Sequence, residues 1–129
     1  MSHPERLGDY LEHIAGAIER AIRYVGGLED LAMLEQDEKS QDAIVRALTV
    51  IGEAAVKIQR DAPQFVIVHP ELPWSQLRGI RNKIVHDYFD IAWDVVWDTV
   101  RQDLPPLLQH VRSLLNCAGD VPLADREKK

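Results

Sequence analysis

The chain has 129 residues and is poor in the features that mark secreted, membrane-bound and metal-dependent proteins. Cys117 is its single cysteine, so an internal disulfide is excluded and a reducing cytoplasm is the expected location. No apolar run approaches the roughly 20 residues that a membrane-spanning helix needs, and the residues after Met1 lack an apolar stretch of signal-peptide type. The five histidines are scattered without metal-ligand spacing, so neither a metal nor a cofactor is expected.

Basic residues are also scarce. The 15 lysines and arginines against 21 acids give a net charge of −6, whereas a protein that grips duplex nucleic acid is usually basic. The exception is local: between Trp74 and His86 the chain carries Arg78, Arg81 and Lys83 without an acidic residue among them. Such a strip fits either contact with one phosphate-rich ligand or a solvated helix face.

Apolar residues recur at helical spacing through most of the chain. Apolar residues make up 46% and charged residues 28%, which is an ordinary globular composition. Buried stripes with i, i+3, i+4 spacing predict four helices, which begin near Pro4 or Glu5, Ser40, Pro73 and Asp90. No segment alternates convincingly at period two. The sequence therefore predicts an all-α, up-and-down bundle of four or five helices in one domain, residues 1–118, followed by a charged, disordered tail, residues 119–129.

Several residues mark the expected helix ends. The pair Gly26–Gly27 ends the first helix, because glycine is favoured just past a helix terminus. Ser40 and Asp90 are the expected N-caps of the second and fourth helices. Gly52, inside the second helix, costs about 1 kcal/mol against alanine, which indicates that another helix packs closely there.

Three segments are harder to assign. Residues 28–38 fit either a short helix or a packed connection, with a polar turn at 37–39. The apolar run Phe65–Val68 fits a short helix or an extended piece, and packing under the bundle is favoured over an exposed contact surface. The pair Pro105–Pro106 predicts a kink or break near Gln102–Asp103 in the fourth helix.

The stretch from Arg81 to Tyr88 carries the chemistry. Histidine exchanges protons near neutral pH, and arginine is a permanent cation that binds phosphate with two hydrogen bonds. Together Arg81 and His86 suit RNA cleavage by the ribose 2′-hydroxyl without a metal. His86 would move a proton at the attacking or leaving oxygen, while Arg81 would stabilise the charge that develops on the phosphate.

The spacing of the two residues raises a geometric question. On one continuous helix Arg81 and His86 would lie roughly 140° apart, whereas Asn82 and His86 would share a face. Either the helix loosens near His86, or the long arginine reaches round, or a second chain completes the site. The simpler alternative is that Arg81 pairs with a carboxylate and His86 caps a helix end.

The ordered set of motifs resembles HepT-like toxins of the HEPN superfamily. The core is the Arg-x4-His-x-Tyr pattern of Arg81, His86 and Tyr88. Its surroundings also match, over about residues 46–108: Ile51–Ala55, Pro73–Trp74, Gly79 and Asp103–Leu108. The apolar run Phe65–Val68 departs from the more polar helix of relatives, which affects the partner surface or the dimer edge.

The resemblance implies a homodimeric helical bundle in which the arginine and histidine motifs of both subunits line one cleft and cleave RNA. It also implies a partner, a minimal nucleotidyltransferase antitoxin of the MntA type, which transfers AMP from ATP to Tyr88. Asn82, Lys83 and Arg78 are the candidate substrate-binding or supporting residues, and Arg46 and Glu53 are further candidates near the cleft.

Two other functions fit the same residues. A non-catalytic helical dimer that binds nucleotide, or that serves a nucleotidyltransferase partner, fits the acidic charge and the phase difference between Arg81 and His86. A purely structural dimer subunit would tolerate changes at Arg81, His86 and Tyr88. Loss of RNA cleavage in His86→Ala separates both from a ribonuclease.

Overall fold

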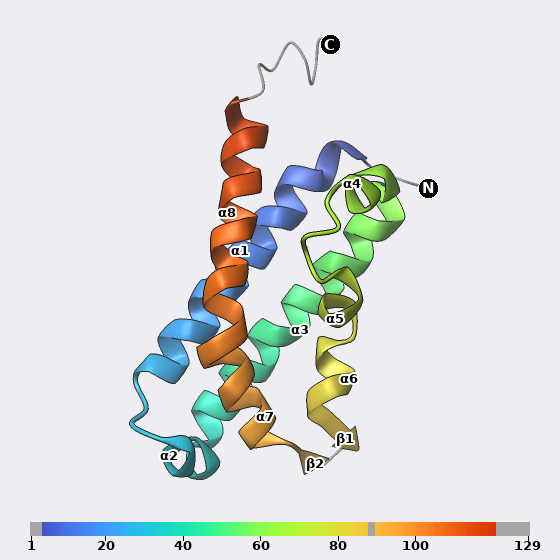
Figure 1. Ribbon diagram of the computed structural model, residues 1–129. Coiled ribbons are helices and arrows are strands. Elements are labelled where there is room, and N and C mark those ends of the chain that lie inside the picture. Colours follow the sequence, from blue (N-terminus) through green and yellow to red (C-terminus); the bar gives the residue numbers. More distant parts are fainter. Residues whose placement is uncertain (1–3, 88–89, 121–129) are drawn as a thin grey trace.

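The computed structural model describes residues 4–87 and 90–120, and most of them are helical (Figure 1). The elements in chain order are η1 (Pro4–Arg6), α1 (Leu7–Gly26), α2 (Leu31–Gln36), α3 (Glu38–Asp61), α4 (Pro63–Val68), α5 (Trp74–Arg78), α6 (Ile80–Ile84), β1 (Val85–Asp87), β2 (Asp90–Ile91), α7 (Trp93–Asp98), the π-helical turn η2 (Thr99–Asp103) and α8 (Leu104–Asp120).

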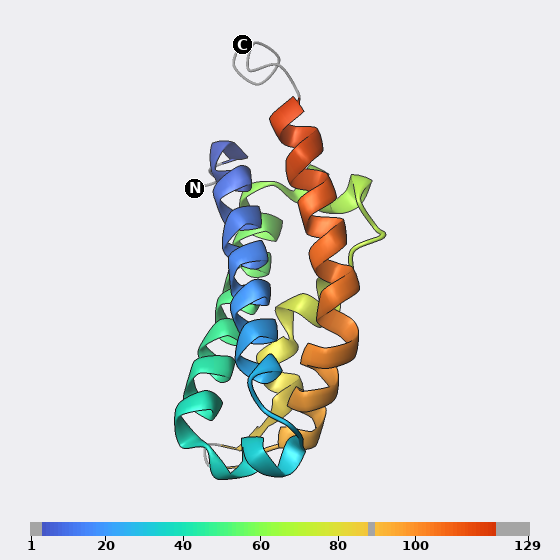
Figure 2. The ribbon, with the colours of Figure 1, turned by 90° about the vertical axis from the view of Figure 1, so that its left-hand side faces the viewer.

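The architecture is the predicted all-α, up-and-down bundle. Its legs are α1, α3, the α5–α6 pair and the continuous α7–η2–α8 run, and successive legs run in opposite directions (Figure 1). Helix α1 lies between α3 and α8 (Figure 2), while α5 and α6 pack on α3. The short α2 and the β1–β2 pair lie at one end of the bundle, and α4 lies at the other. Among the helices of the described residues, none is long and apolar enough to cross a membrane.

The core consists of the stripes that the apolar spacing predicts. Apart from Leu34 of α2, the fully buried large side chains come from three legs: Leu11, Ile14 and Ile18 from α1; Ile44, Leu48, Ile51 and Ile58 from α3; and Val96, Val100 and Leu104 from the last leg. Each such side chain stabilises the fold by roughly 1.5–3 kcal/mol relative to exposure. Burial of these stripes therefore outweighs local helix propensity in holding the bundle together.

The helix ends agree only in part with the sequence. Helix α1 ends at Gly26, as predicted. The N-cap of α3 is Asp37, not Ser40: the Asp37 carboxylate accepts hydrogen bonds from the Ser40 amide (3.2 Å) and hydroxyl (2.8 Å). The polar turn predicted at 37–39 is thus already the start of the helix. Asp90 is likewise no cap, because it lies in β2 and α7 begins at Trp93.

The proline pair disturbs the last leg where expected. Pro105 and Pro106 lack amide hydrogens, so they cannot complete the hydrogen bonds of an α-helix with the preceding turn. The backbone widens into the π-helical turn Thr99–Asp103 directly before them, which agrees with the break predicted near Gln102–Asp103. Helix α8 then continues to Asp120, and residues 121–129 of the predicted tail lie outside the described residues.

The apolar run Phe65–Val68 is helical but only half covered. Phe65 packs edge-on against Trp74, with ring centroids 6.1 Å apart, and Val66 also contacts the core. Ile67 and Val68 are 68% and 66% exposed. The favoured prediction, that the run packs under the bundle, is therefore wrong for its second half, because one turn of helix turns these two side chains outward.

A buried carboxylate links α1 to the end of α3. The Asp61 side chain is 1% exposed and accepts a hydrogen bond from the Tyr10 hydroxyl at 2.9 Å. Arg60 donates to both Asp61 oxygens, at 2.6 and 3.0 Å. The Asp61 hydrogen bond and charge raise the pKa of Arg60, and burial together with the Asp61 bond raises the pKa of Tyr10. These bonds supply the partners that a buried carboxylate needs.

Candidate functional site

The motif segment is held against the middle of α3. Trp74, Leu77 and Ile80 are buried, as predicted for this helix. A β-carbon at Gly52 would lie 3.3 Å from the Leu77 carbonyl oxygen and 3.4 Å from Cγ2 of Ile80. Glycine at position 52 therefore allows α5 and α6 to approach α3 closely, which confirms the packing role expected for it. The predicted single helix is divided at Gly79 into α5 and α6.

The helix ends between the two motif residues. Arg81 is the second residue of α6, which ends at Ile84, and His86 is the middle residue of β1. The two residues therefore do not share one continuous helix, and the phase difference of an ideal helix does not apply. Of the alternatives that the sequence leaves open, the structure contains the first, a change of backbone conformation before His86.

The backbone at His86 is irregular in a second way. Strands β1 and β2 pair antiparallel, with Val85 opposite Ile91 and Asp87 opposite Asp90, so the ladder has an irregularity between Val85 and Asp87. His86 is thus the extra residue of a β-bulge. Bulges change the local direction of a strand and are enriched next to active sites. Tyr88, the predicted modification site, lies outside the described residues.

Arg78 lines a groove on the α3 side of the motif. The groove has a volume of about 430 Å³ and is lined by Thr49, Gly52, Glu53, Val56, Lys57, Arg60 and Arg78. The Arg78 guanidinium donates a hydrogen bond to Oε1 of Gln59, which joins α5 to α3. Lys57 and Arg60 also line this groove beside one lining acid, Glu53, and Arg60 is paired with the buried Asp61. Cations so placed suit contact with phosphate groups.

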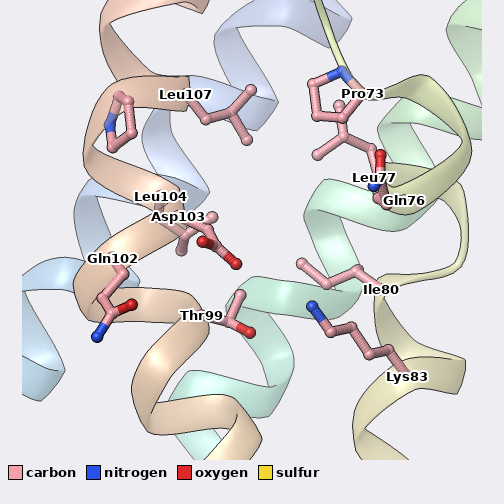
Figure 3. A pocket seen from close by; sticks show the side chains of 11 residues that line it. Pro73, Gln76, Leu77, Ile80, Lys83, Thr99, Gln102, Asp103, Leu104 and Leu107 are labelled. Atoms are coloured by element: carbon pink, nitrogen blue, oxygen red, sulfur yellow. The ribbon is translucent and has the colours of Figure 1, made fainter.

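Lys83 lines a different depression. A cavity of about 350 Å³ lies between the α5–α6 pair and the last leg, and its lining is Pro73, Gln76, Leu77, Ile80, Lys83, Thr99, Gln102, Asp103, Leu104, Pro106 and Leu107. Figure 3 shows the Lys83 amino group pointing into this space, toward the side occupied by Thr99 and Asp103. Asn82 is exposed. The structure therefore does not bring Arg78 and Lys83 together in one pocket.

The cavity is lined by polar residues that the sequence did not assign to a site. Gln76 lines it from α5, and Gln102 and Asp103 line it from the π-helical turn. Figure 3 shows the Asp103 carboxylate pointing into the space. Single π-helical turns are frequent at functional sites. The signal that points to this turn is the proline pair, Pro105–Pro106, although it indicates a local distortion and not a cavity.

Comparisons with known proteins show which family the chain resembles. Residues 14–114 match the family model described as "Ribonuclease HepT-like". The chain is 42% identical over 101 residues to a protein of Thermococcus cleftensis named "Probable ribonuclease HepT", covering 77% of this chain and 86% of the relative. It is 33% identical over 108 residues to a protein of Caldanaerobacter subterraneus subsp. tengcongensis named "Putative RNase", covering 82% and 91%. No solved structure matches significantly.

The family match covers most of the helical bundle and the motif segment. The bundle is all-helical, and the match at residues 14–114 includes Arg81, Asn82, Lys83 and His86. The chain belongs to the HepT-like ribonuclease family.

Proposed function

We propose that this protein is a metal-independent endoribonuclease toxin of the cytoplasm, with Arg81 and His86 as its catalytic residues. Family membership and the Arg-x4-His-x-Tyr motif carry the proposal. The end of α6 before His86 supports it further, because residues on a helix terminus and a bulged strand are not restricted to opposite faces of one helix.

The proposed reaction is an internal displacement at phosphorus. The ribose 2′-oxygen loses its proton and forms a bond to the adjacent phosphorus, and the bond from phosphorus to the 5′-oxygen breaks as that oxygen takes up a proton. The products are a 2′,3′-cyclic phosphate and a 5′-hydroxyl. His86 moves one of these protons, and Arg81 stabilises the extra negative charge on the phosphoryl oxygens.

A homodimer would complete the site. The reaction needs both a base and an acid, while the motif supplies a single histidine, His86. Two copies that face one another across a cleft would provide two histidines and two arginines. Arg78, in the α3 groove, and Lys83, at the cavity, would then bind phosphates that flank the scissile one. Asn82 is exposed and would donate hydrogen bonds to the RNA.

We further propose that a minimal nucleotidyltransferase antitoxin of the MntA type silences the toxin at Tyr88. The tyrosine oxygen would attack the α-phosphorus of ATP, and pyrophosphate would leave. The AMP group would add a negative charge two residues from His86. Added phosphate charge repels RNA and pairs with the arginine that the substrate needs.

The test is RNA cleavage by the purified protein in the presence of a chelator. Removal of a general acid or base typically costs about 10²–10⁴-fold, so His86→Ala should lose cleavage by that factor. His13→Ala, an exposed histidine on α1, is the matched control and should cleave normally. Equal cleavage by wild type and His86→Ala contradicts the proposal. If neither protein cleaves and the intact mass shows no AMP on Tyr88, the protein is a non-catalytic binding module.

A further inference from the structure

The outward face of α3 carries a regular pattern of charge. Asp42, Arg46, Thr49, Glu53 and Lys57 lie on the side of the helix opposite its buried stripe. At about 100° per residue, these five fall within about 80° of arc. Along this face the signs therefore run negative, positive, neutral, negative, positive. Within the described part of the chain, none of the four charged residues forms an ion pair.

The same face is hollowed on either side of Thr49. One depression, of about 530 Å³, includes Asp42, Val45 and Arg46 in its lining. The other is the groove of about 430 Å³ that Arg78 lines, and it includes Glu53 and Val56. Val56 is 49% exposed, although it is apolar. Each hollow thus combines an exposed or half-buried valine with charged residues on the same helix.

We propose that a second copy of this chain occupies this face, with the two α3 helices antiparallel and the two-fold axis between Thr49 and Val50. Arg46 and Glu53 lie equally far from that midpoint, on either side of it. In an antiparallel pair each Arg46 therefore faces Glu53 of the second copy. By the same symmetry Asp42 faces Lys57, so one register satisfies four charges on each copy.

The valines fit the same register. Val45 and Val56 lie on the same edge of the face, and their distances from the midpoint differ by about two residues, or about 3 Å along the helix, so Val45 of one copy comes close to Val56 of the other. Contact between Val45 and Val56 thus joins the hollow of one copy to the groove of the other. Exposed ion pairs contribute at most about 1 kcal/mol each, so the charges select the register while apolar burial supplies most of the affinity.

This arrangement gives the motif a defined position in the dimer. Ile80 of α6 packs against Gly52, close to the proposed axis. The α6 helices of both copies therefore lie beside one axis, and with them the chain leading to His86. The inference rests on the homodimer of the proposed function and specifies its surface, which the motif alone does not indicate.

Charge reversal tests the pairing. Arg46→Glu places two acids against each other twice per dimer, and Glu53→Arg does the same with two cations. We expect each single variant to raise the dimer Kd by about tenfold or more in sedimentation equilibrium. The double variant R46E/E53R restores opposite charges and should return the Kd to near that of wild type. Arg23→Glu, an exposed arginine on α1, is the control and should leave the Kd unchanged.

A cross-link tests the axis itself. Thr49→Cys in a Cys117→Ser background should form a disulfide-linked dimer on mild oxidation, whereas Gln109→Cys, exposed on α8, should not.

A monomeric wild type at micromolar concentration would overturn the inference. A dimer whose mass is unchanged by both single reversals, with Thr49→Cys unlinked, would also overturn it but leave the proposed ribonuclease standing. Loss of cleavage alone does not change these masses, so the two proposals fail separately.

Discussion

Gly52 meets the backbone of Leu77: a β-carbon at position 52 would lie 3.3 Å from the Leu77 carbonyl oxygen. This contact sets how closely the motif segment approaches α3. It makes the motif position depend on a residue that has no functional group.

Replacement of Gly52 by valine should therefore destabilise the fold and shift α6. Overpacking of a well-packed contact costs typically about 1–3 kcal/mol, and urea unfolding measures the loss. Gly8→Val is the matched control, because a β-carbon at Gly8 meets nothing within 4 Å. Equal stability of the two variants would show that α5 and α6 do not rest on Gly52. RNA cleavage by Gly52→Val should fall along with stability.

Asp61→Ala should remove the hydrogen bond between α1 and the end of α3 and so lower the stability of the fold. The change removes the acceptor of the Tyr10 hydroxyl and of Arg60. A buried donor left without its partner costs about 1–3 kcal/mol, which thermal unfolding should report as a lower Tm. Asp9→Ala, an exposed acid on α1, is the control. An unchanged Tm in Asp61→Ala would mean that water replaces the carboxylate without loss.

The cap of α3 predicts a pH dependence. Hydrogen bonds from Ser40 lower the pKa of Asp37 below its ordinary value. A lowered folded-state pKa contributes stability that is complete above the unfolded-state pKa, about 3.9, and is lost as the pH falls through the folded value. The stability gap between wild type and Asp37→Ala should thus be widest at neutral pH and should close below about pH 4.

Ser40→Ala provides the internal comparison for that experiment. Ser40→Ala removes the hydroxyl donor at 2.8 Å but keeps the amide donor. In that background, the loss of stability caused by Asp37→Ala should be smaller than in the wild-type background, and it should disappear at a higher pH. A gap that stays constant from pH 7 to pH 3 would contradict the cap.

Tyr88→Phe tests the proposed silencing. The variant keeps the ring but lacks the oxygen that would accept AMP, so it should remain toxic when a nucleotidyltransferase of the MntA type is co-expressed with it. Wild type should become non-toxic and gain the mass of AMP. Tyr24→Phe, half-buried on α1, should behave like wild type. Silencing of Tyr88→Phe would place the modification elsewhere or exclude it.

The long helices were predictable because each buries one continuous stripe. Leu11, Ile14 and Ile18 on α1, and Ile44, Leu48 and Ile51 on α3, repeat often enough for the helical period to stand out. The caps were less predictable, since Asp37 and Ser40 both suit an N-cap and lie three residues apart. The N-cap preferences of the two residue types do not decide which one is the cap. In the structure Asp37 is the cap, because its carboxylate accepts hydrogen bonds from the Ser40 amide and hydroxyl.

The short elements could not be predicted by the same reasoning. Strands β1 and β2 have three and two residues, too few to show an alternating pattern. Arg81 and His86 could be proposed from the sequence as residue types, whereas the change of backbone between them could not. The separation of Arg78 from Lys83 into two depressions depends on contacts with α3 and with the last leg, which lie far away in sequence.

The end of α6 at Ile84 has a consequence for how this motif tolerates change in length. On an unbroken helix, one inserted residue would turn the histidine by about 100° and separate it from the arginine. Here the insertion would fall in the bulged strand, where an extra residue is accommodated as a local bend. The separation of Arg81 from His86 then depends on the length of the strand, so a change in this spacing would leave the bundle that holds the motif intact.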